Sequence, residues 1–473
     1  MTESVIQKVV NPRTGLTDFS FLNPSEYEIA SKCEFLRIGQ KNWRTISVNE
    51  RVDVLKVWKE NIEAAKPALI DALSKDTGRM SETLLEVEIV GTSIDRWSNI
   101  AISFFEQELK KSSSIPFLSI QQDFVPFPLV AVISPWNFPL LLSLIDAIPA
   151  LLAGCSVIVK PSEVTPRFIE IIQQTINKTP ILRDVLFYVT GNGSVGEAMV
   201  ANADIVCFTG STSTGKKVYR AACERFIPVF LELGGKDPAL VFEGADLELA
   251  SSAILWGSTV NAGQSCLSIE RVYVQDTVFE DFVDRIVAKT RKIKLAFPSI
   301  NDGQIGPIIS SKQVEIIDKQ LADALAKGAK ILCGNEKCQE LNGGFYCEPT
   351  ILTNVNHSMK IMQEETFGPI VPLMSFSTEQ EAISLANGTI YGLSGAVFHS
   401  DIEKAIEIGK QIEGGAISIN DAALTAIMHE GEKNSFKMSG IGGTRMGPSA
   451  IKRFMRQKTN LIKTNQNPDP WWF

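Results

Sequence analysis

Histidine is scarce in this chain: the 473 residues contain only three. A cysteine–histidine dyad or a histidine-rich metal site therefore has few candidates, and a carboxylate must be considered as the general base. The eight cysteines include no Cys-x-x-Cys pair, and the spacing of Cys333, Cys338 and Cys347 fits no zinc template. We therefore expect reduced thiols and no metal site.

An excess of positive charge is also missing, since the net charge is −8. Nucleic-acid binders need a basic face, so we expect no nucleic-acid partner. No apolar stretch follows the polar start 1–4, so no secretory signal is visible. The longest apolar stretch, 138–159, is broken by Asp146 and two prolines, which predicts a buried helix-turn-strand and no integral membrane segment. We expect a cytoplasmic protein.

The length exceeds what one hydrophobic core supports, so we expect two or three domains. Short Val- and Ile-rich runs alternate with helical stretches, which is typical of parallel sheets buried on both faces. The runs fall into two sets, 129–133, 156–159, 185–189 and 205–208, then 239–242, 272–274, 370–373 and 416–419. The expected fold class is α/β, with a Rossmann-like cofactor domain and an α/β catalytic domain.

Two further regions complete the expected organisation. Apolar residues recur at helical spacing between 50 and 110, which predicts long amphipathic helices. Short runs at 117–120 and 124–127 suggest strands.

Cys266 lies among small and polar neighbours in the segment 261–266, unlike Cys207, which sits among aliphatic residues. A cysteine in such a context is a candidate for an exposed nucleophile, although a plain loop cysteine is the alternative. Asn137, held between two prolines, could be a turn residue or an amide donor to an oxyanion. Glu232 could be an ordinary strand residue, but its apolar neighbours suit a base that takes a proton from water.

These segments, with others in the same order along the chain, resemble the NAD(P)-dependent aldehyde dehydrogenase superfamily. The motifs that carry the resemblance are Pro-Trp-Asn-Phe-Pro from 135, Lys-Pro-Ser-Glu from 160, Phe-Thr-Gly-Ser-Thr from 208, Glu-Leu-Gly-Gly-Lys from 232, Gly-Gln-Ser-Cys from 263, Glu-Glu-Thr-Phe-Gly-Pro from 364 and Lys-Met-Ser-Gly from 437. The resemblance covers nearly the whole chain. It implies that Cys266 attacks an aldehyde, Asn137 stabilises the oxyanion, and Glu232 activates the water that releases the acid.

The residues alone do not identify the cofactor-binding site. Gly-x-Gly-x-x-Gly at 191–196 also fits an ordinary strand-to-helix turn, and Lys217 replaces the hydroxyl that a P-loop at 210–217 would need. The resemblance implies NAD, with NADP as the alternative, because Glu163 on the ribose hydroxyls would repel a 2′-phosphate. The cofactor-binding residues it implies are Ile133, Ser134, Trp136, Lys160, Ser162, Glu163, Gly193, Phe208, Thr209, Gly210, Ser211, Leu233, Gly234, Glu365 and Phe367.

The resemblance also places a substrate tunnel in front of Cys266. Its expected lining is apolar, namely Leu142, Ile145, Leu267, Leu424, Ile427 and Met428. This predicts a medium or long aliphatic, aromatic or isoprenoid aldehyde, with a semialdehyde or other small polar aldehyde, or a catalytically silent binding protein, as alternatives. The chain departs from many relatives at Asp146, where lysine is common, and in the run 441–445.

We predict three parts of the chain. Residues 1–107 and 127–234 form the NAD-binding domain, residues 235–440 form the catalytic domain, and residues 108–126 and 441–473 form the oligomerisation arm and tail. In the resembled family, the segment around 117–127 is a hairpin that pairs with other subunits, so the resemblance implies an oligomerisation arm there and a homodimer or homotetramer. The aromatic end, Trp471, Trp472 and Phe473, could contact a neighbouring subunit or a membrane surface.

Overall fold

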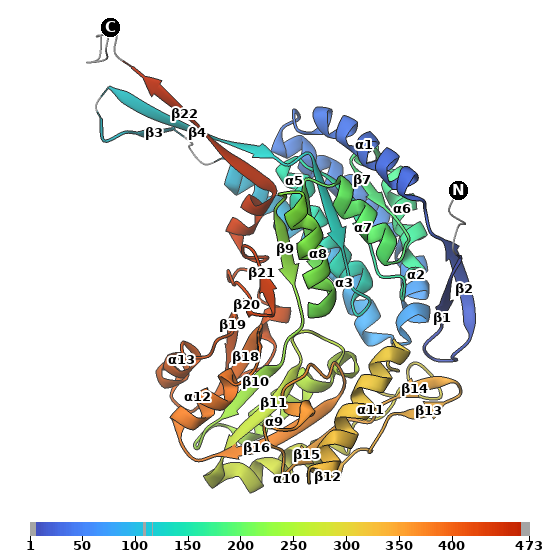
Figure 1. Ribbon diagram of the computed structural model, residues 1–473, viewed down its shortest axis with the longest axis vertical. Helices are drawn as coiled ribbons and strands as arrows, with labels where there is room; N and C mark the ends of the chain where they lie inside the picture. Colours follow the sequence, from blue (N-terminus) through green and yellow to red (C-terminus); the bar gives the residue numbers. More distant parts are fainter. Residues whose placement is uncertain (1–5, 107–109, 116, 465–473) are drawn as a thin grey trace.

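The structure, a computed structural model, describes residues 6–106, 110–115 and 117–464. Two sheets with largely parallel strands lie one beyond the other along the long axis, and a narrow three-stranded arm projects from one side (Figure 1). The α/β fold class with a Rossmann-like half is confirmed. The predicted tail residues Trp471, Trp472 and Phe473 lie outside the described residues.

The first sheet has the order β21-β9-β8-β5-β6-β7, and all neighbours are parallel except β21 with β9. Its strands are β5 (Leu129–Ile133), β6 (Ser156–Lys160), β7 (Leu186–Tyr188), β8 (Ile205–Thr209), β9 (Val229–Glu232) and β21 (Gly440–Ile441). The four predicted runs are strands here. Every residue of β5, β6 and β8 is buried, as expected of strands covered by helices on both faces.

The helices of this half follow from the sequence pattern. They are α1 (Glu26–Trp43), α2 (Val48–Thr77), α3 (Ser81–Phe105), α4 (Pro139–Leu144), α5 (Ala147–Ala153), α6 (Phe168–Asn177), α7 (Gly193–Asn202) and α8 (Thr212–Glu224). The predicted long helices are α2 and α3. The apolar stretch 138–159 forms α4, α5 and β6, so the predicted helix-turn-strand is also confirmed.

The second sheet has the order β12-β15-β16-β11-β10-β18-β19, with only β12 antiparallel to its neighbour. Its strands are β10 (Asp237–Val241), β11 (Ile269–Gln275), β12 (Lys330–Cys333), β15 (Thr350–Thr353), β16 (Ile370–Phe376), β18 (Ser394–Phe398) and β19 (Ala416–Ile419). The four runs predicted for a second sheet are β10, β11, β16 and β19. The helices packed against it are α9 (Leu247–Thr259), α10 (Phe279–Thr290), α11 (Ser311–Ala326), α12 (Glu379–Asn387) and α13 (Ile402–Gly409).

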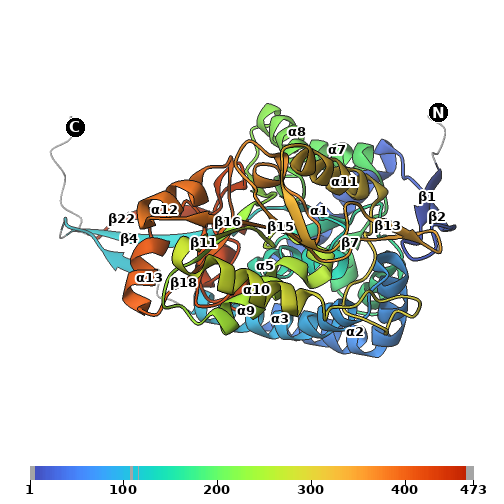
Figure 2. The ribbon, with the colours of Figure 1, turned by 90° about the horizontal axis from the view of Figure 1, so that it is seen from below.

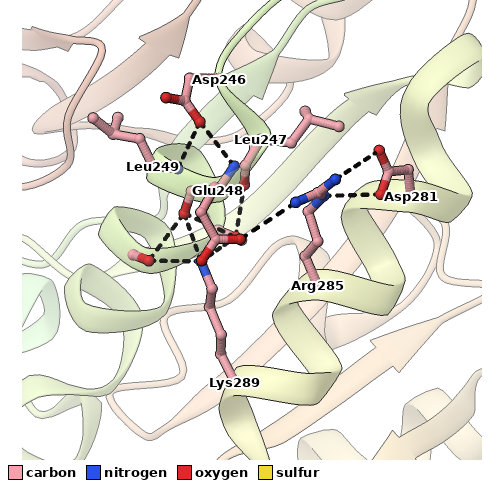
Figure 3. Close-up of polar contacts among 9 residues, drawn as sticks. Asp246, Leu247, Glu248, Leu249, Asp281, Arg285 and Lys289 are labelled. Atoms are coloured by element: carbon pink, nitrogen blue, oxygen red, sulfur yellow. Dashed lines mark hydrogen bonds and ion pairs between the residues drawn. The ribbon is translucent and has the colours of Figure 1, made fainter.

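Helix α9 leads directly into the turn before Cys266, and polar contacts fix its start (Figure 3). Asp246 accepts hydrogen bonds from the backbone N–H groups of Glu248 and Leu249, which are otherwise without helical partners. The Glu248 carboxylate lies 2.9 Å from Lys289 and 3.4 Å from Arg285, both on α10. The helix that leads into the turn before Cys266 is thereby tied to α10.

One prediction about cysteines was wrong. Cys338 and Cys347 form a disulfide, although reduced thiols were expected throughout. Strands β13 (Gln339–Leu341) and β14 (Gly344–Tyr346) pair as a hairpin, with Gln339 opposite Tyr346. The cysteines flank this pair and therefore face each other, which is a consequence of hairpin register that spacing alone does not reveal.

The arm consists of β3 (Lys110–Ser112), β4 (Leu118–Pro126) and β22 (Met455–Lys463), with β4 in the middle (Figures 1 and 2). The predicted strands at 117–120 and 124–127 are one continuous strand. In the part of the chain that the structure describes, no helix has both the length and the apolar character needed to cross a bilayer.

Candidate active site

A cavity of ≈ 110 Å³ lies where the carboxyl ends of β8 and β9 meet the turn that precedes β11. In α/β sheets, ligands bind at this edge of the strands. The cavity is lined by Pro135, Trp136, Asn137, Leu142, Thr209, Gly210, Ser211, Glu232, Leu233, Gly234, Cys266, Gln313, Glu365 and Phe367. It thus brings together the three residues predicted to be catalytic.

The turn that presents Cys266 has an unusual backbone. Asn261, Ala262 and Gly263 have consecutive φ angles of 57°, 54° and 70°. A β-carbon on Gly263 would stand 2.3 Å from the backbone of Gly368, so only glycine fits. The Asn261 amide donates to the backbone oxygens of Gln264 (2.9 Å) and Asn137 (3.2 Å), which holds this left-handed turn in place.

Asn137 is buried directly beside the nucleophile turn. Its Nδ2 donates to the backbone oxygen of Gln264 at 3.0 Å, two residues before Cys266. Its own backbone oxygen accepts from the Arg79 guanidinium at 2.7 Å. An amide nitrogen has two N–H donors, so this anchored side chain has a second donor to offer in the cavity.

The Cys266 residue is half-buried, and its thiol is more enclosed than the exposed nucleophile that its small neighbours suggested. Burial raises the pKa of the thiol to about 12, and Lys433 is the charge that acts most strongly in the opposite direction. Glu365, Asp237 and Glu232 add to the rise. The surroundings therefore hold the thiol protonated, and Lys433 supplies the cation that favours a thiolate.

Glu232 is the last residue of β9, at the carboxyl edge of the first sheet. Its Oε2 accepts a hydrogen bond from the Ser435 hydroxyl at 3.1 Å. Strand β21 pairs with β9 so that Gly440 stands opposite Glu232. The carboxylate thus enters the cavity from the first sheet, while the thiol enters from the turn before the second.

The loop 364–369 closes the cavity from the side of β16. Glu270 accepts from the backbone N–H groups of Thr366 (2.7 Å) and Phe367 (2.8 Å), and its charge is balanced by the buried Lys236 at 2.7 Å. Glu365 accepts from the Gly235 N–H at 3.1 Å, and burial raises the pKa of its carboxyl to about 8. The loop is therefore held rigidly by buried polar contacts.

The residues predicted to bind cofactor follow the carboxyl ends of neighbouring strands. Lys160 at the end of β6 donates to Gly191 (2.7 Å) and approaches Glu163 (3.4 Å). Ser211 is the N-cap of α8, where free N–H groups favour a phosphate. The Ser134 hydroxyl is buried without a partner among the described residues, and a side chain at Gly193 would meet open space. These features fit a dinucleotide along the sheet edge.

The cavity lining contains eight of the predicted cofactor-binding residues in addition to the three predicted catalytic residues. Phe367 and Trp136 face each other edge to face across it, with ring centroids 5.3 Å apart. Lys160, Ser162 and Glu163 lie outside its lining, further along the sheet edge at the end of β6. The adenosine and nicotinamide ends expected of a dinucleotide would therefore be held by different strands.

The predicted substrate residues divide into two groups. Leu142 lines the cavity, and Ile145, Leu267 and Leu424 are partly buried. Ile427 and Met428 are 70% and 56% exposed, so they lie at the surface.

Two residues near the C-terminal end of the chain have no role predicted from the sequence. Ser435 donates a hydrogen bond to Glu232, and the charge of Lys433 acts on Cys266. The motif Lys-Met-Ser-Gly from 437 marked this neighbourhood, but nothing in the sequence indicated which side chains turn inward. The pairing of β21 with β9 is the contact that brings them there.

Residues 2–460 match the family model described as "Aldehyde dehydrogenase family". A chloroplastic betaine aldehyde dehydrogenase of Atriplex hortensis is 33% identical over 98% of this chain and 94% of its own length. A 4,4′-diapolycopene aldehyde oxidase of Methylomonas is 35% identical over 91% of this chain and 81% of its own.

Solved structures agree. PutA of Anabaena variabilis superposes with a TM-score of 0.97 at 53% identity, covering 99% of this chain and 100% of that one. Betaine aldehyde dehydrogenase of Staphylococcus aureus in complex with NAD⁺ gives 0.91 at 31% identity, covering 99% and 93%.

Proposed function

This chain belongs to the aldehyde dehydrogenase family and is an NAD-dependent oxidoreductase, and from that premise we propose that it oxidises an apolar aldehyde through a thioester on Cys266. The observation that carries the proposal is the meeting of Cys266, Asn137 and Glu232 in one cavity, each from a different element. A thiol, an amide donor and a carboxylate are the groups that covalent oxidation of an aldehyde needs.

In the first half of the reaction, the Cys266 thiolate attacks the aldehyde carbon and forms a thiohemiacetal. The oxyanion accepts hydrogen bonds from Asn137 Nδ2 and the backbone N–H of Cys266. One such donor contributes roughly 3 kcal/mol to transition-state stabilisation. NAD, when bound, accepts the hydride.

In the second half, Glu232 takes a proton from a water that attacks the thioester carbonyl. The carbon–sulfur bond breaks, and the carboxylic acid leaves with the thiolate restored. The hydroxyl of Ser435 orients the carboxylate for this step. A thiol esterase lacking the oxidative half would leave the dinucleotide features at the sheet edge without a purpose.

The proposed cofactor contacts follow the geometry of the sheet edge. Lys160 and Glu163 would hold the adenosine ribose, and Ser211 at the start of α8 would hold the pyrophosphate. Glu365 would hold the nicotinamide ribose, with Phe367 and Trp136 beside the ring. The same proposal includes the other residues along this edge, namely Ile133, Ser134, Ser162, Gly193, Phe208, Thr209, Gly210, Leu233 and Gly234.

The experiment that tests these roles is a pre-steady-state measurement of NADH with two variants. Cys266→Ala should abolish NADH formation while NAD still binds. Glu232→Gln should retain a burst near one NADH per active site and then slow sharply, because only thioester hydrolysis is impaired. Turnover in Cys266→Ala would require another nucleophile, and loss of the burst together with the steady state in Glu232→Gln would remove Glu232 from deacylation.

The proposed substrate class is a medium or long aliphatic, aromatic or isoprenoid aldehyde. Support comes from Leu142 in the cavity, from the partly buried Leu267 and Leu424, and from the isoprenoid substrate named for the Methylomonas relative. Each methylene buried by the enzyme gains ~0.8 kcal/mol, so kcat/KM should rise about fourfold per added carbon until the tunnel is filled.

A second candidate is a small polar or carboxylated aldehyde. The positive charge of Lys433, which acts on Cys266, favours this class, and several similar proteins are named for betaine aldehyde or aminoaldehydes. A panel from acetaldehyde to decanal together with succinic semialdehyde separates the two classes. A higher kcat/KM for the semialdehyde than for octanal or decanal would contradict the apolar assignment.

We also propose an NAD-binding domain of residues 1–107 and 127–234, a catalytic domain of residues 235–440, and an oligomerisation arm and tail of residues 108–126 and 441–473. The proposed assembly is a homodimer or homotetramer, and the proposed location is the cytoplasm. The exposed strand β22 beside β4 supports an arm that contacts a second copy. The separate sheets on either side of residues 233–236 support a boundary near 234.

A further inference from the structure

Three buried charged residues around the start of α3 lie behind the proposed oxyanion site: Arg79, Glu82 and Glu86. Their exposed fractions are 3%, 7% and 1%, and none of them lines the cavity. Charged side chains removed from water are costly unless each has a specific partner. The partners of these three include backbone groups of the two segments that carry Asn137 and Cys266.

Arg79 contacts the oxyanion segment at Asn137 itself. Its Nη2 donates to the backbone oxygen of Asn137 at 2.7 Å, and its guanidinium lies 4.5 Å from the centre of the Phe138 ring. The Nε and Nη1 atoms of Arg79 are buried without a hydrogen-bond partner among the described residues. A buried donor left unsatisfied costs about 1–3 kcal/mol, so stability alone does not account for an arginine at this position.

Glu86 contacts the other end of the same segment. Its Oε1 accepts from the backbone N–H of Leu141 at 2.8 Å, in the first turn of α4, where N–H groups have no helical partner. Its Oε2 lies 3.6 Å from Nη2 of Arg79, so the two side chains form an ion pair. Residues 137–141 are thus held at both ends by one pair of opposite charges.

Glu82 contacts the nucleophile turn. Its Oε1 accepts from the backbone N–H of Asn261 at 3.0 Å, and the Asn261 amide donates to the backbone oxygen of Asn137 at 3.2 Å. The start of α3 therefore holds both the segment with the oxyanion donor and the turn with the thiol. Because Arg79 and Asn261 donate to the same oxygen, the backbone carbonyl of Asn137 is the point where the two segments are joined.

We propose that Arg79 is a positioning residue for the oxyanion, because it holds the backbone of Asn137 and so keeps Nδ2 aimed at the oxygen of the tetrahedral intermediate. The side-chain amide donates one N–H to the backbone oxygen of Gln264, so a fixed backbone leaves the second N–H with a single direction. A misplacement of about 1 Å in a group of this kind lowers a rate by about 100-fold. This inference rests on the proposed role of Asn137 as an oxyanion donor.

The test compares two reactions of Cys266 in the full-length enzyme, neither of which needs the cofactor. p-Nitrophenyl acetate acylates the thiolate: the carbon–sulfur bond forms through a tetrahedral oxyanion, the ester carbon–oxygen bond breaks, and p-nitrophenolate leaves. Iodoacetamide alkylates the same thiolate by displacement of iodide, and no oxyanion forms. A change that affects only the aim of Asn137 therefore lowers the first rate and leaves the second unchanged.

Arg79→Met should lower the rate constant for acylation at least about tenfold and leave that for alkylation within about twofold of the wild type. The burst of p-nitrophenolate measures acylation, and mass spectrometry of the peptide that contains Cys266 measures alkylation. Arg79→Lys retains a charge and a donor, so it should lower acylation only about threefold. If Arg79→Met does not fold, the difference between the two reactions in Arg79→Lys carries the same prediction.

A double variant separates positioning from a general structural role. Asn137→Ala should lower acylation about 100-fold and leave alkylation unchanged. In that background, Arg79→Met should lower acylation by a further factor of less than about two, because the donor that Arg79 aims is already absent.

Arg51→Met is the matched control. Arg51 is also buried, donates to the backbone oxygen of Ile46 at 3.1 Å, and lies 5.4 Å from the ring of Phe105. None of these contacts involves residues 135–141 or 261–266. Both rate constants of this variant should match those of the wild type.

An equal fall in acylation and alkylation in Arg79→Met would show that the whole site has moved, and it would overturn the inference. An equal effect of Arg79→Met with and without Asn137 would do the same, as would a similar fall in acylation in Arg51→Met. If Asn137→Ala itself leaves acylation unchanged, the proposed function of Asn137 fails instead.

Discussion

At the scale of single residues, the reactivity of Cys266 depends on a charge that lies far away in sequence. Burial favours the thiol, and Lys433 favours the thiolate. We expect Lys433→Met to move the thiol titration to higher pH and so to slow acylation near neutral pH, since each unit of pKa change reduces the thiolate fraction about tenfold. The rate of alkylation by iodoacetamide as a function of pH measures this directly.

Lys433→Arg is the control for that change, because it retains the charge and should retain most of the alkylation rate. A profile that stays in place in Lys433→Met would mean that Lys433 does not reach the thiol. In that case, a different group must favour the thiolate of Cys266.

Glu163 carries the prediction about cofactor choice. Its side chain is partly exposed, with one oxygen 3.4 Å from Lys160 at the end of β6. Glu163→Ala should raise the ratio of kcat/KM for NADP to that for NAD by about tenfold, because it removes repulsion of the 2′-phosphate and leaves Lys160 to attract it. Glu170→Ala on α6 makes the same change in net charge and should leave the ratio unaltered. An unchanged ratio in Glu163→Ala would place this carboxylate away from the ribose.

At the scale of elements, the nucleophile turn is the most constrained piece of the site. Gly263 has a positive φ and no room for a side chain against Gly368. We expect Gly263→Ala to destabilise the fold by about 2 kcal/mol and to displace Cys266. Thermal unfolding and the NADH burst report the two effects. Gly431→Ala, where a β-carbon meets open space, should behave as the wild type; equal behaviour of both variants would show that the turn relaxes easily.

The sequence predicted the elements that have a clear period. Strands β5, β6 and β8 are continuous apolar runs, and apolar residues recur at helical spacing in α2 and α3. The sequence therefore predicted these strands and these helices. The antiparallel β21 spans two residues, too short for any period to show. The disulfide between Cys338 and Cys347 depends on the register of a hairpin with weak apolar patterning. Such features are decided by long-range packing that leaves little trace in local composition.

The active site likewise contains some residues that a local sequence motif identifies and others that only long-range packing brings in. Motifs in the family's order identified Cys266, Asn137 and Glu232, which the structure brings into one cavity. Lys433 and Ser435 act on Cys266 and Glu232 from about 170 and 200 residues away in sequence. Their side chains turn inward because β21 pairs with β9, and that pairing has no local signal.

At the scale of the whole molecule, chemistry is divided between two cores. The first sheet contributes Glu232 and the cofactor edge, and the second contributes the turn with Cys266 and the loop with Glu365 (Figure 1). Because the reacting groups come from both, small changes in how the cores sit together alter the distances between them. The network of Asn261, Gln264 and Asn137 bridges the cores with short hydrogen bonds, so it limits such changes.

The arm gives the last prediction. In β22, Met455 is buried, but the next residues along the strand are exposed, and Leu461 is 78% exposed. Among the residues that the structure describes, no strand pairs with the other edge of β22 over 456–461. Long, exposed edges of this kind are usually covered, and a second copy of the chain would cover both the edge and Leu461.

We expect Leu461→Asp to raise the dissociation constant of the oligomer at least tenfold, so that smaller species dominate. Sedimentation velocity across a concentration series measures this constant. Leu249→Asp, on the surface of α9 far from the arm, should leave the distribution unchanged. A wild-type chain that sediments as a monomer, or an unaffected Leu461→Asp variant, would show that the arm has a different partner.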